Sequence, residues 1–366
     1  MASGYFLTGI TTSNLFKLVR RNRLSFHPKY LSRFIVVLLY SFGTTIFTLC
    51  EKLFYSRKID QTACPQDPIF IVGHWRSGTT FLHQIFNAMP GFKTPSVLEI
   101  GTPESFLVSK KILSPIMQRI LPSKRSTDNV ALSLEEPQED EYALFRATTL
   151  SPVEKLIFPE KDSFFLDNEC DFLPPPTKEE KWRTTLRTFC KKLSLTGSGG
   201  KIVLKNPFHS TRILYLKKMF PKAKFIHIYR DPVKVIPSTI RMWKIEGQQN
   251  SLHEGYTTPT LERTISIYDT ILKKIKKALK HLPDNDYCTI NFSDLETDPE
   301  ATLTTALQKI GIPLSQEQRQ ELSTFVGSLK HYRKNRYSLP KEDESLIRKR
   351  LKHHIDAAPV LLTKPA

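Results

Sequence analysis

The stretch PIFIVGHWRSGTTFLHQIFNAM, residues 68–89, decides the fold of this chain. It opens with a short apolar run, Ile69 to Val72, which is typical of a buried strand in a parallel sheet. A tight loop follows at 73–78, and residues 79–89 then place apolar side chains at the spacing of one helix face. A strand, a glycine-bounded loop and a helix form a phosphate cradle, in which loop N–H groups and the positive helix end face an anion.

The glycine spacing matches the P-loop pattern G-x-x-x-x-G-K-[ST] with one exception. Gly73 and Gly78 occupy the glycine positions and Thr80 the hydroxyl position, but Thr79 stands where the lysine belongs. Kinases and NTPases use that lysine on the transferring phosphate. Here the loop's positive charge comes from Arg76. The alternative interpretation is a loop that only joins a strand to a helix.

Further strands alternate with helices along the chain. Helices are predicted at 178–195 and 210–220, and strands at 201–205, 224–230 and 286–291. This alternation predicts an α/β fold, with a parallel β-sheet flanked by helices and joined by right-handed crossovers.

Three basic residues stand where predicted strands end. Arg76 follows the first strand, Lys205 ends the second and Arg230 ends the third. Because parallel sheets bind ligands at the carboxyl ends of their strands, the three cations should converge on one edge. A buried strand end rarely carries a charge without an anion or a partner to match it. The alternative is three unrelated charges, each paired with a local carboxylate.

Two motifs resemble the PAPS-dependent sulfotransferases, where PAPS is 3′-phosphoadenylyl sulfate, the sulfuryl donor. R-S-G-T-T after the first strand resembles their 5′-phosphosulfate loop, and YRDPVKVIPS resembles their 3′-phosphate motif. The resemblance covers residues 66–340 and implies a P-loop-like sulfotransferase fold. It implies that the 5′-phosphosulfate is held by Arg76, Ser77, Gly78, Thr79 and Thr80, and the 3′-phosphate by Arg230 and Ser238.

The resemblance also implies a charge-stabilising lysine and a general base. By position, Lys205 is similar to the family lysine that stabilises charge on the transferring sulfuryl group. Many cytosolic members carry a histidine base two residues later, where this chain has Pro207. That departure leaves the base open.

The acidic run P-Q-E-D-E, residues 137–141, resembles a segment found in one branch of the family. From composition alone it is a solvated helix start, with Pro137 in the first turn. The functional interpretation places one of its carboxylates in the site as the general base. Glu139 and Glu141 are the preferred candidates, with Glu99 and His209 behind them.

A basic segment near the C-terminus adds a weaker match. Family members carry an R-K-G that closes over the 3′-phosphate, and Arg333-Lys334-Asn335 matches it without the glycine. Arg333 and Lys334 are therefore predicted to help bind the donor. The alternative is a solvated basic tail.

The motifs together predict in-line transfer of a sulfuryl group from PAPS to an acceptor hydroxyl or amine on a lipid, glycan or small molecule. No metal is expected, because protein cations would take the role of magnesium in kinases. Two alternatives remain: a P-loop nucleotide kinase or NTPase, and a non-enzymatic, membrane-bound nucleotide-binding module.

Charge and hydropathy predict a membrane partner. The net charge of +18 favours an anionic partner, and no nucleic-acid partner is expected because zinc-finger spacing and RNP-type aromatic motifs are absent. Residues 1–33 are basic, and the uncharged run 34–49, extended to 55, predicts membrane association. The expected division is a basic N-terminus with a hydrophobic, membrane-associated helix at 1–60, a sulfotransferase domain at 66–340 and a C-terminal tail at 341–366. The catalytic domain is expected in the cytoplasm, with a luminal location as the alternative if 34–55 spans the membrane.

Overall fold

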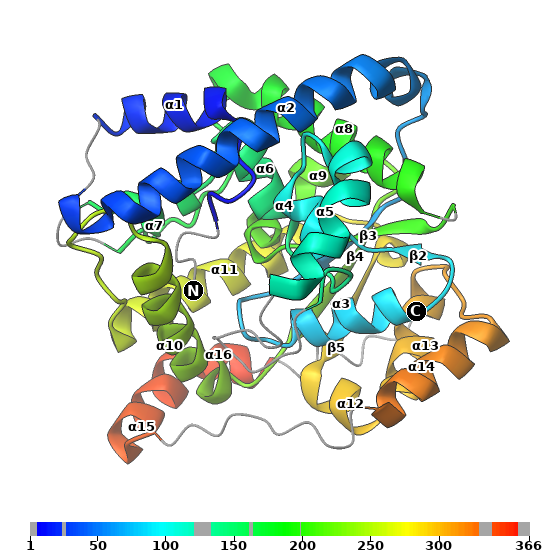
Figure 1. The fold of residues 1–366 in the computed structure, drawn as a ribbon. Helices are drawn as coiled ribbons and strands as arrows, with labels where there is room; N and C mark the ends of the chain where they lie inside the picture. The colour runs from blue at the N-terminus through cyan, green and yellow to red at the C-terminus, as the bar shows by residue number, and fades with distance from the viewer. Residues whose placement is uncertain are drawn as a thin grey trace.

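A five-stranded parallel sheet forms the centre of the molecule (Figure 1). The computed structural model describes residues 6–23, 27–120, 133–160, 164–197, 199–328 and 339–357. The strand order is β2-β3-β1-β4-β5. The strands are β1 (Ile69–Val72), β2 (Phe92–Lys93), β3 (Lys201–Lys205), β4 (Lys224–Tyr229) and β5 (Tyr287–Asn291). The predicted fold class is therefore confirmed, and β2 is a short edge strand that the sequence pattern did not predict.

The central strands β1, β3 and β4 are buried because most of their residues are apolar, whereas the edge strands β2 and β5 are only partly buried. Phe70 and Leu204 face a core built with α6 (Asp140–Thr148), α8 (Glu179–Thr196), α9 (Ile213–Met219) and α11 (Leu261–Leu279). Ile69, Ile71 and Ile226 face the other core, built with α3 (Thr79–Ala88), α13 (Pro299–Lys309) and α14 (Gln316–Ser328). This alternation follows from the two-residue period of a strand.

Strand register sets the position of the site. Ile71 pairs with Lys205 on β3 and with Ile226 on β4. The residues that follow β1, β3 and β4 therefore emerge at the same edge of the sheet. At this edge Asp231 caps α10 (Pro232–Asn250), accepting a 2.9 Å hydrogen bond from the Val233 N–H.

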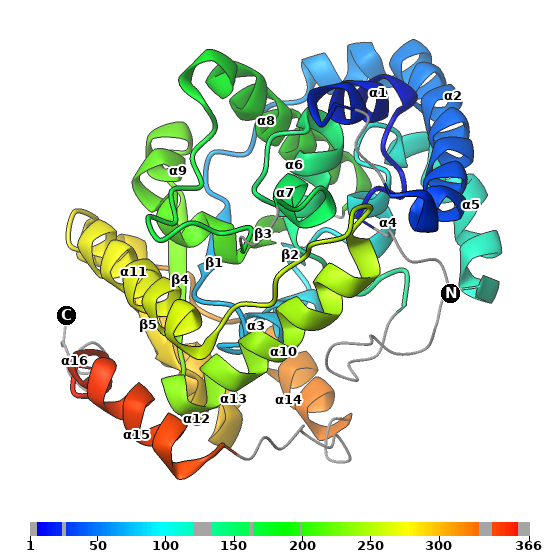
Figure 2. The ribbon, with the colours of Figure 1, turned by 90° about the vertical axis from the view of Figure 1, so that its left-hand side faces the viewer.

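Two N-terminal helices form an outer layer beside α5, α6 and α8 (Figures 1 and 2). They are α1 (Thr12–Arg21) and α2 (Leu31–Gln61). The predicted hydrophobic helix exists, and its 31 residues make it longer than the uncharged run alone. The remaining helices are α4 (Val97–Gly101), α5 (Phe106–Ile120), α7 (Val153–Ile157), α12 (Phe292–Thr297), α15 (Lys341–Arg350) and α16 (Lys352–Ile355). All five cysteines are free, in line with their wide spacing.

The prediction that Pro137 opens a helix is wrong. Pro137 forms an isolated antiparallel bridge with Ser96, and the Gln138 N–H donates to the Pro95 carbonyl at 2.9 Å. These contacts hold the chain extended, so α6 begins only at Asp140.

Candidate active site

The loop between β1 and α3 requires glycine at both ends. Gly78 has φ 102°, and a Cβ there would lie 2.1 Å from the Phe292 ring. At Gly73, with φ 153°, a Cβ would lie 2.7 Å from the Ile228 carbonyl oxygen. The Gly73 N–H donates to the Ser210 hydroxyl at 2.9 Å, which fixes the loop against the segment after β3.

The N-terminus of α3 opens toward this loop without a side-chain cap. Its N-cap residue is Gly78, which offers no side-chain acceptor to the first N–H groups of the helix. Arg76 adopts φ 67°, a left-handed conformation that costs energy for a residue with a Cβ and that recurs at functional sites. Ser77 donates its hydroxyl to the His74 carbonyl at 2.7 Å and so supports the turn. The result is a set of N–H groups and a positive helix end suited to an anion.

The three predicted cations meet at this edge of the sheet. Arg230 Nη1 donates to the Arg76 carbonyl at 3.3 Å, and Lys205 Nζ lies 3.5 Å from Thr80 Oγ1. Arg76 Nε donates to Ser238 Oγ at 2.9 Å. The Arg76 side chain therefore lies beside a residue that the resemblance gives to the 3′-phosphate, and it connects the two predicted phosphate sites.

Glu139 is the carboxylate that reaches this group of cations. It occupies the N-cap position of α6, and its Oε1 accepts a hydrogen bond from Lys205 Nζ at 2.7 Å. Lys205 itself is 1% exposed. Glu139 Oε2 is buried and accepts no hydrogen bond from any residue that the structure describes. One oxygen of Glu139 thus holds the lysine, and the other is available to a bound molecule.

Glu141 lies elsewhere, in a buried ionic network. Its side chain is fully buried and accepts hydrogen bonds from Arg212 Nη1 at 2.6 Å and from Asn206 Nδ2 at 2.8 Å. Ser151 donates to its other oxygen at 2.6 Å. Burial alone would raise the pKa of Glu141, but the Arg212 guanidinium, with hydrogen bonds from Arg212 and Ser151, holds it below its ordinary value. These contacts do not fit the predicted role as a general base, because both carboxylate oxygens are occupied.

The two further candidates for the general base, His209 and Glu99, also have hydrogen-bond partners. His209 is fully buried, and its Nε2 lies 2.7 Å from Asp140 Oδ2. Glu99 is fully buried, forms a capping box with Ser96 and pairs with Lys93 at 2.8 Å. Each side chain is bonded to a neighbouring side chain, Asp140 or Lys93, and not to the loop at 73–78.

The predicted site residues do not include Arg212, Asn206 or Asp140. These three residues fasten the start of α6 to the segment after β3. The available signal was the run of three acids at 139–141, since a buried run of carboxylates requires basic partners elsewhere in the chain. Arg333 and Lys334 lie outside the described residues, and their role stays a prediction.

Among the described residues, one group has a geometry that could hold a metal ion: Asp269, His353 and His354. The two imidazoles lie 2.9 and 2.8 Å from the Asp269 carboxylate, which also accepts from Lys273 at 2.7 Å. Lys276 lies 3.1 Å from His354 Nδ1. Two ammonium groups oppose a further cation here, so we interpret the group as the contact that fastens α16 to α11.

Comparison with known proteins identifies the family. Residues 68–316 match the sulfotransferase family. This chain belongs to that family. The sulfotransferase is 30% identical over 349 residues to the omega-hydroxy-beta-dihydromenaquinone-9 sulfotransferase Stf3 of Mycobacterium bovis, covering 93% of this chain and 87% of that protein. The same values apply to the protein of that name from Mycobacterium tuberculosis.

Solved structures agree with the fold of the sulfotransferase. Sulfotransferase STF9 from Mycobacterium avium matches with a TM-score of 0.65 at 15% identity, over 95% of this chain and 91% of that one. Sulfotransferase STF1 from Mycobacterium tuberculosis matches with a TM-score of 0.60 at 17% identity, over 94% and 88%. The predicted enzyme class, a sulfotransferase, is therefore confirmed, and the kinase alternative does not fit this family.

Proposed function

We propose that this sulfotransferase uses PAPS as its donor, with Lys205 and Glu139 at the reacting atoms. The observation that carries the proposal is the 2.7 Å hydrogen bond between Lys205 Nζ and Glu139 Oε1, beside the uncapped N-terminus of α3. A cation, a carboxylate and free N–H groups at one sheet edge suit the transfer of an anionic group to a hydroxyl.

The loop fits a doubly phosphorylated adenosine. The tight turn between Gly73 and Gly78 and the uncapped helix end suit the 5′-phosphosulfate. Arg230, with Ser238 close to the Arg76 guanidinium, suits the 3′-phosphate. In this proposal the donor is held by Arg76, Ser77, Gly78, Thr79, Thr80, Arg230 and Ser238, with Arg333 and Lys334 as further candidates.

The proposed reaction is one in-line displacement at sulfur. Glu139 Oε2 takes the proton of the acceptor hydroxyl or amine as the new bond to sulfur forms. The bond between sulfur and the bridging phosphate oxygen breaks, and Lys205 neutralises the charge that grows on that oxygen. The products are the sulfated acceptor and 3′-phosphoadenosine 5′-phosphate (PAP). Since Arg76 and Lys205 already supply positive charge, we propose that the transfer needs no metal.

The acceptor is proposed from two observations. The Mycobacterium bovis relative is named for a hydroxylated menaquinone derivative. In this chain α2 exposes many large apolar side chains, among them Leu39 at 65% and Leu53 at 76%. We propose that the acceptor is a hydroxyl group on a long-chain apolar molecule.

Donor specificity tests the proposal directly. Calorimetry without magnesium should show PAP binding more tightly than AMP or ATP, because Arg230 and Ser238 select the 3′-phosphate. Arg230→Ala should weaken PAP binding by roughly 30-fold, the equivalent of about 2 kcal/mol for a charged hydrogen bond. Arg319→Ala is the matched control, since that guanidinium donates to Thr304 on α13. Tighter binding of AMP or ATP by the unmodified chain would contradict the choice of donor.

Glu139→Gln tests the general base. The amide oxygen can still accept from Lys205, but the side chain can no longer take a proton, so kcat should fall roughly 100-fold. PAP affinity, measured by calorimetry, should stay close to that of the unmodified chain. Glu135→Gln is the control from just before the acidic run 137–141, because that carboxylate is 62% exposed and pairs with Lys110. An unchanged kcat in Glu139→Gln would show that Glu139 is not the general base.

A further inference from the structure

The middle turns of α2 present polar side chains to the domain, while Phe34, Leu38, Tyr55 and Ile59 pack against the core nearer the two ends of the helix. Five of its residues are buried against the domain, at spacings of three and four that define one helix face. Four of the five are polar, namely Ser41, Thr44, Thr48 and Glu51, and the fifth is Val37. An amphipathic helix of a soluble domain turns its apolar side chains to the core instead.

Specific polar contacts hold this inner face to the domain. Thr45 Oγ1 accepts a 2.9 Å hydrogen bond from the Thr12 N–H of α1. Glu51 accepts from the Leu107 N–H of α5 at 2.8 Å and forms a buried ion pair with Lys192 of α8, whose side chain is 4% exposed. If α2 left the domain to cross a bilayer, Lys192 would lose its carboxylate and the polar face would enter hydrocarbon.

The outer face of α2 is apolar along most of its length. Its exposed side chains lie on the face opposite the buried set: Leu31, Ile35, Val36, Leu39, Tyr40, Phe42, Ile46, Leu49, Leu53 and Phe54. Phe16 on the adjacent helix α1 is also 62% exposed. Contiguous apolar surface of this extent marks an interaction site.

Positive charge predominates beside the apolar face, although Asp60 near the end of α2 is also exposed. The first fifty residues contain no aspartate or glutamate, and their basic residues are Lys17, Arg20, Arg21, Arg23, Lys29 and Arg33. Lys17, Arg20 and Lys29 are exposed, as is Lys52 on α2 itself. Basic residues beside an apolar helix face complement the anionic headgroups and acyl chains of a lipid surface.

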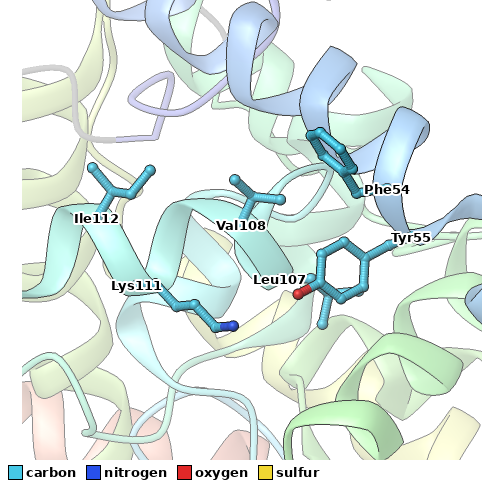
Figure 3. Close-up of a pocket in the computed structure, with 6 residues that line it drawn as sticks. All are labelled: Phe54, Tyr55, Leu107, Val108, Lys111 and Ile112. Atoms are coloured by element: carbon cyan, nitrogen blue, oxygen red, sulfur yellow. The ribbon is translucent and has the colours of Figure 1, made fainter.

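A groove extends the apolar face onto α5. Its volume is about 450 Å³, and Figure 3 shows the side chains that line it from the two helices: Phe54, Tyr55, Leu107, Val108, Lys111 and Ile112. Five of these side chains are apolar or aromatic, and Lys111 adds one positive charge. This combination suits an acyl chain with an anionic headgroup beside it.

We propose that α2 docks the enzyme on an anionic lipid surface by lying in the membrane plane rather than crossing it. The helix is long and apolar enough to span a bilayer, but its inner face is already committed to the domain. Both ends of α2 and the catalytic domain then stay on one side of the membrane. This inference goes beyond the proposed sulfuryl transfer and does not depend on it, because docking is measured without substrates.

Vesicle flotation of the full chain tests the docking face. Vesicles of phosphatidylcholine with phosphatidylglycerol should bind the chain more tightly than phosphatidylcholine alone, and added salt should weaken binding. The double variant Leu49→Glu with Leu53→Glu should lose roughly tenfold or more in partitioning. Leu214→Glu, at an apolar residue of α9 that is 45% exposed, is the matched control. A far-ultraviolet circular dichroism spectrum that matches that of the unmodified chain shows that each variant is folded.

The opposite results would overturn the proposal. One is equal partitioning of the double variant and the unmodified chain. Another is a double variant that changes from dimer to monomer in sedimentation without losing vesicle binding, since a second copy would then cover the face.

A topology measurement distinguishes lying from spanning. Single cysteines replace Arg20 and Thr62, which lie before and after α2, in a chain carrying Cys50→Ser and Cys64→Ser. A membrane-impermeant maleimide, added to closed membrane vesicles from expressing cells, should label both positions from the same side. Labelling from opposite sides would show a span and would overturn the proposal.

Discussion

Replacing Lys205 with methionine is expected to lower kcat for sulfuryl transfer by roughly 100- to 1,000-fold. Lys205 is 1% exposed, and its ammonium lies between Glu139 Oε1 and Thr80 Oγ1. Charge develops on the leaving oxygen mainly in the transition state, so most of the loss should be in kcat rather than in donor binding. The measurement is initial rate at saturating PAPS, together with calorimetry of PAP binding.

The same strand offers a matched control. Lys201→Met makes the identical substitution at the other end of β3, where the ammonium pairs with Asp67. It should leave kcat close to that of the unmodified chain. If Lys205→Met also kept its kcat, the site at this sheet edge would not perform the chemistry.

Replacing Glu141 with alanine is expected to lower the free energy of unfolding by about 3–5 kcal/mol. The substitution leaves Arg212 buried at 1% exposure without its carboxylate and also deprives Asn206 of a hydrogen-bond acceptor. Urea unfolding followed by circular dichroism measures the loss. Glu135→Ala removes an exposed carboxylate just before residues 137–141 and should change stability little. A loss of stability in Glu135→Ala as large as in Glu141→Ala would contradict a specific role for the buried network.

The stability difference should depend on pH in a defined direction. Folding lowers the pKa of Glu141 below its ordinary value of 4.5, despite burial, because Arg212 attracts its charge. Such a group contributes stability that is fully present above the unfolded pKa and is lost as pH falls through the folded pKa. The difference in free energy of unfolding between the unmodified chain and Glu141→Ala should be constant near neutrality. It should become smaller below about pH 4.5. A difference that grew in acid would contradict the charged pairing.

Local patterns were enough to predict the sheet and its cation-bearing edge. The branched run at 69–72, the two glycines of the loop and the helix spacing after them describe one continuous stretch. Parallel strands have their carboxyl ends on the same side of a sheet, so the sequence positions of Arg76, Lys205 and Arg230 implied their convergence. The sequence also predicted the family, through two motifs more than 150 residues apart.

Only the tertiary structure distinguished Glu139 from Glu141. Glu139 is the extended N-cap residue of α6, whereas Glu141 lies in the first turn of the helix, so their side chains point in different directions. The bridge between Ser96 and Pro137 sets where α6 begins, and so directs Glu139 to Lys205 and Glu141 to Arg212. Sequence spacing cannot contain this information, since the bridge and both basic partners come from distant parts of the chain.

For the N-terminal helix too, the sequence determines some properties and the tertiary structure determines others. Its length and apolar composition are properties of the sequence, and they predicted a helix with affinity for membranes. Its orientation was decided by the domain, because Thr12, Leu107 and Lys192 provide partners for the polar face. Buried polar groups must find hydrogen bonds, so the position of those partners fixed which face of the helix remained outside.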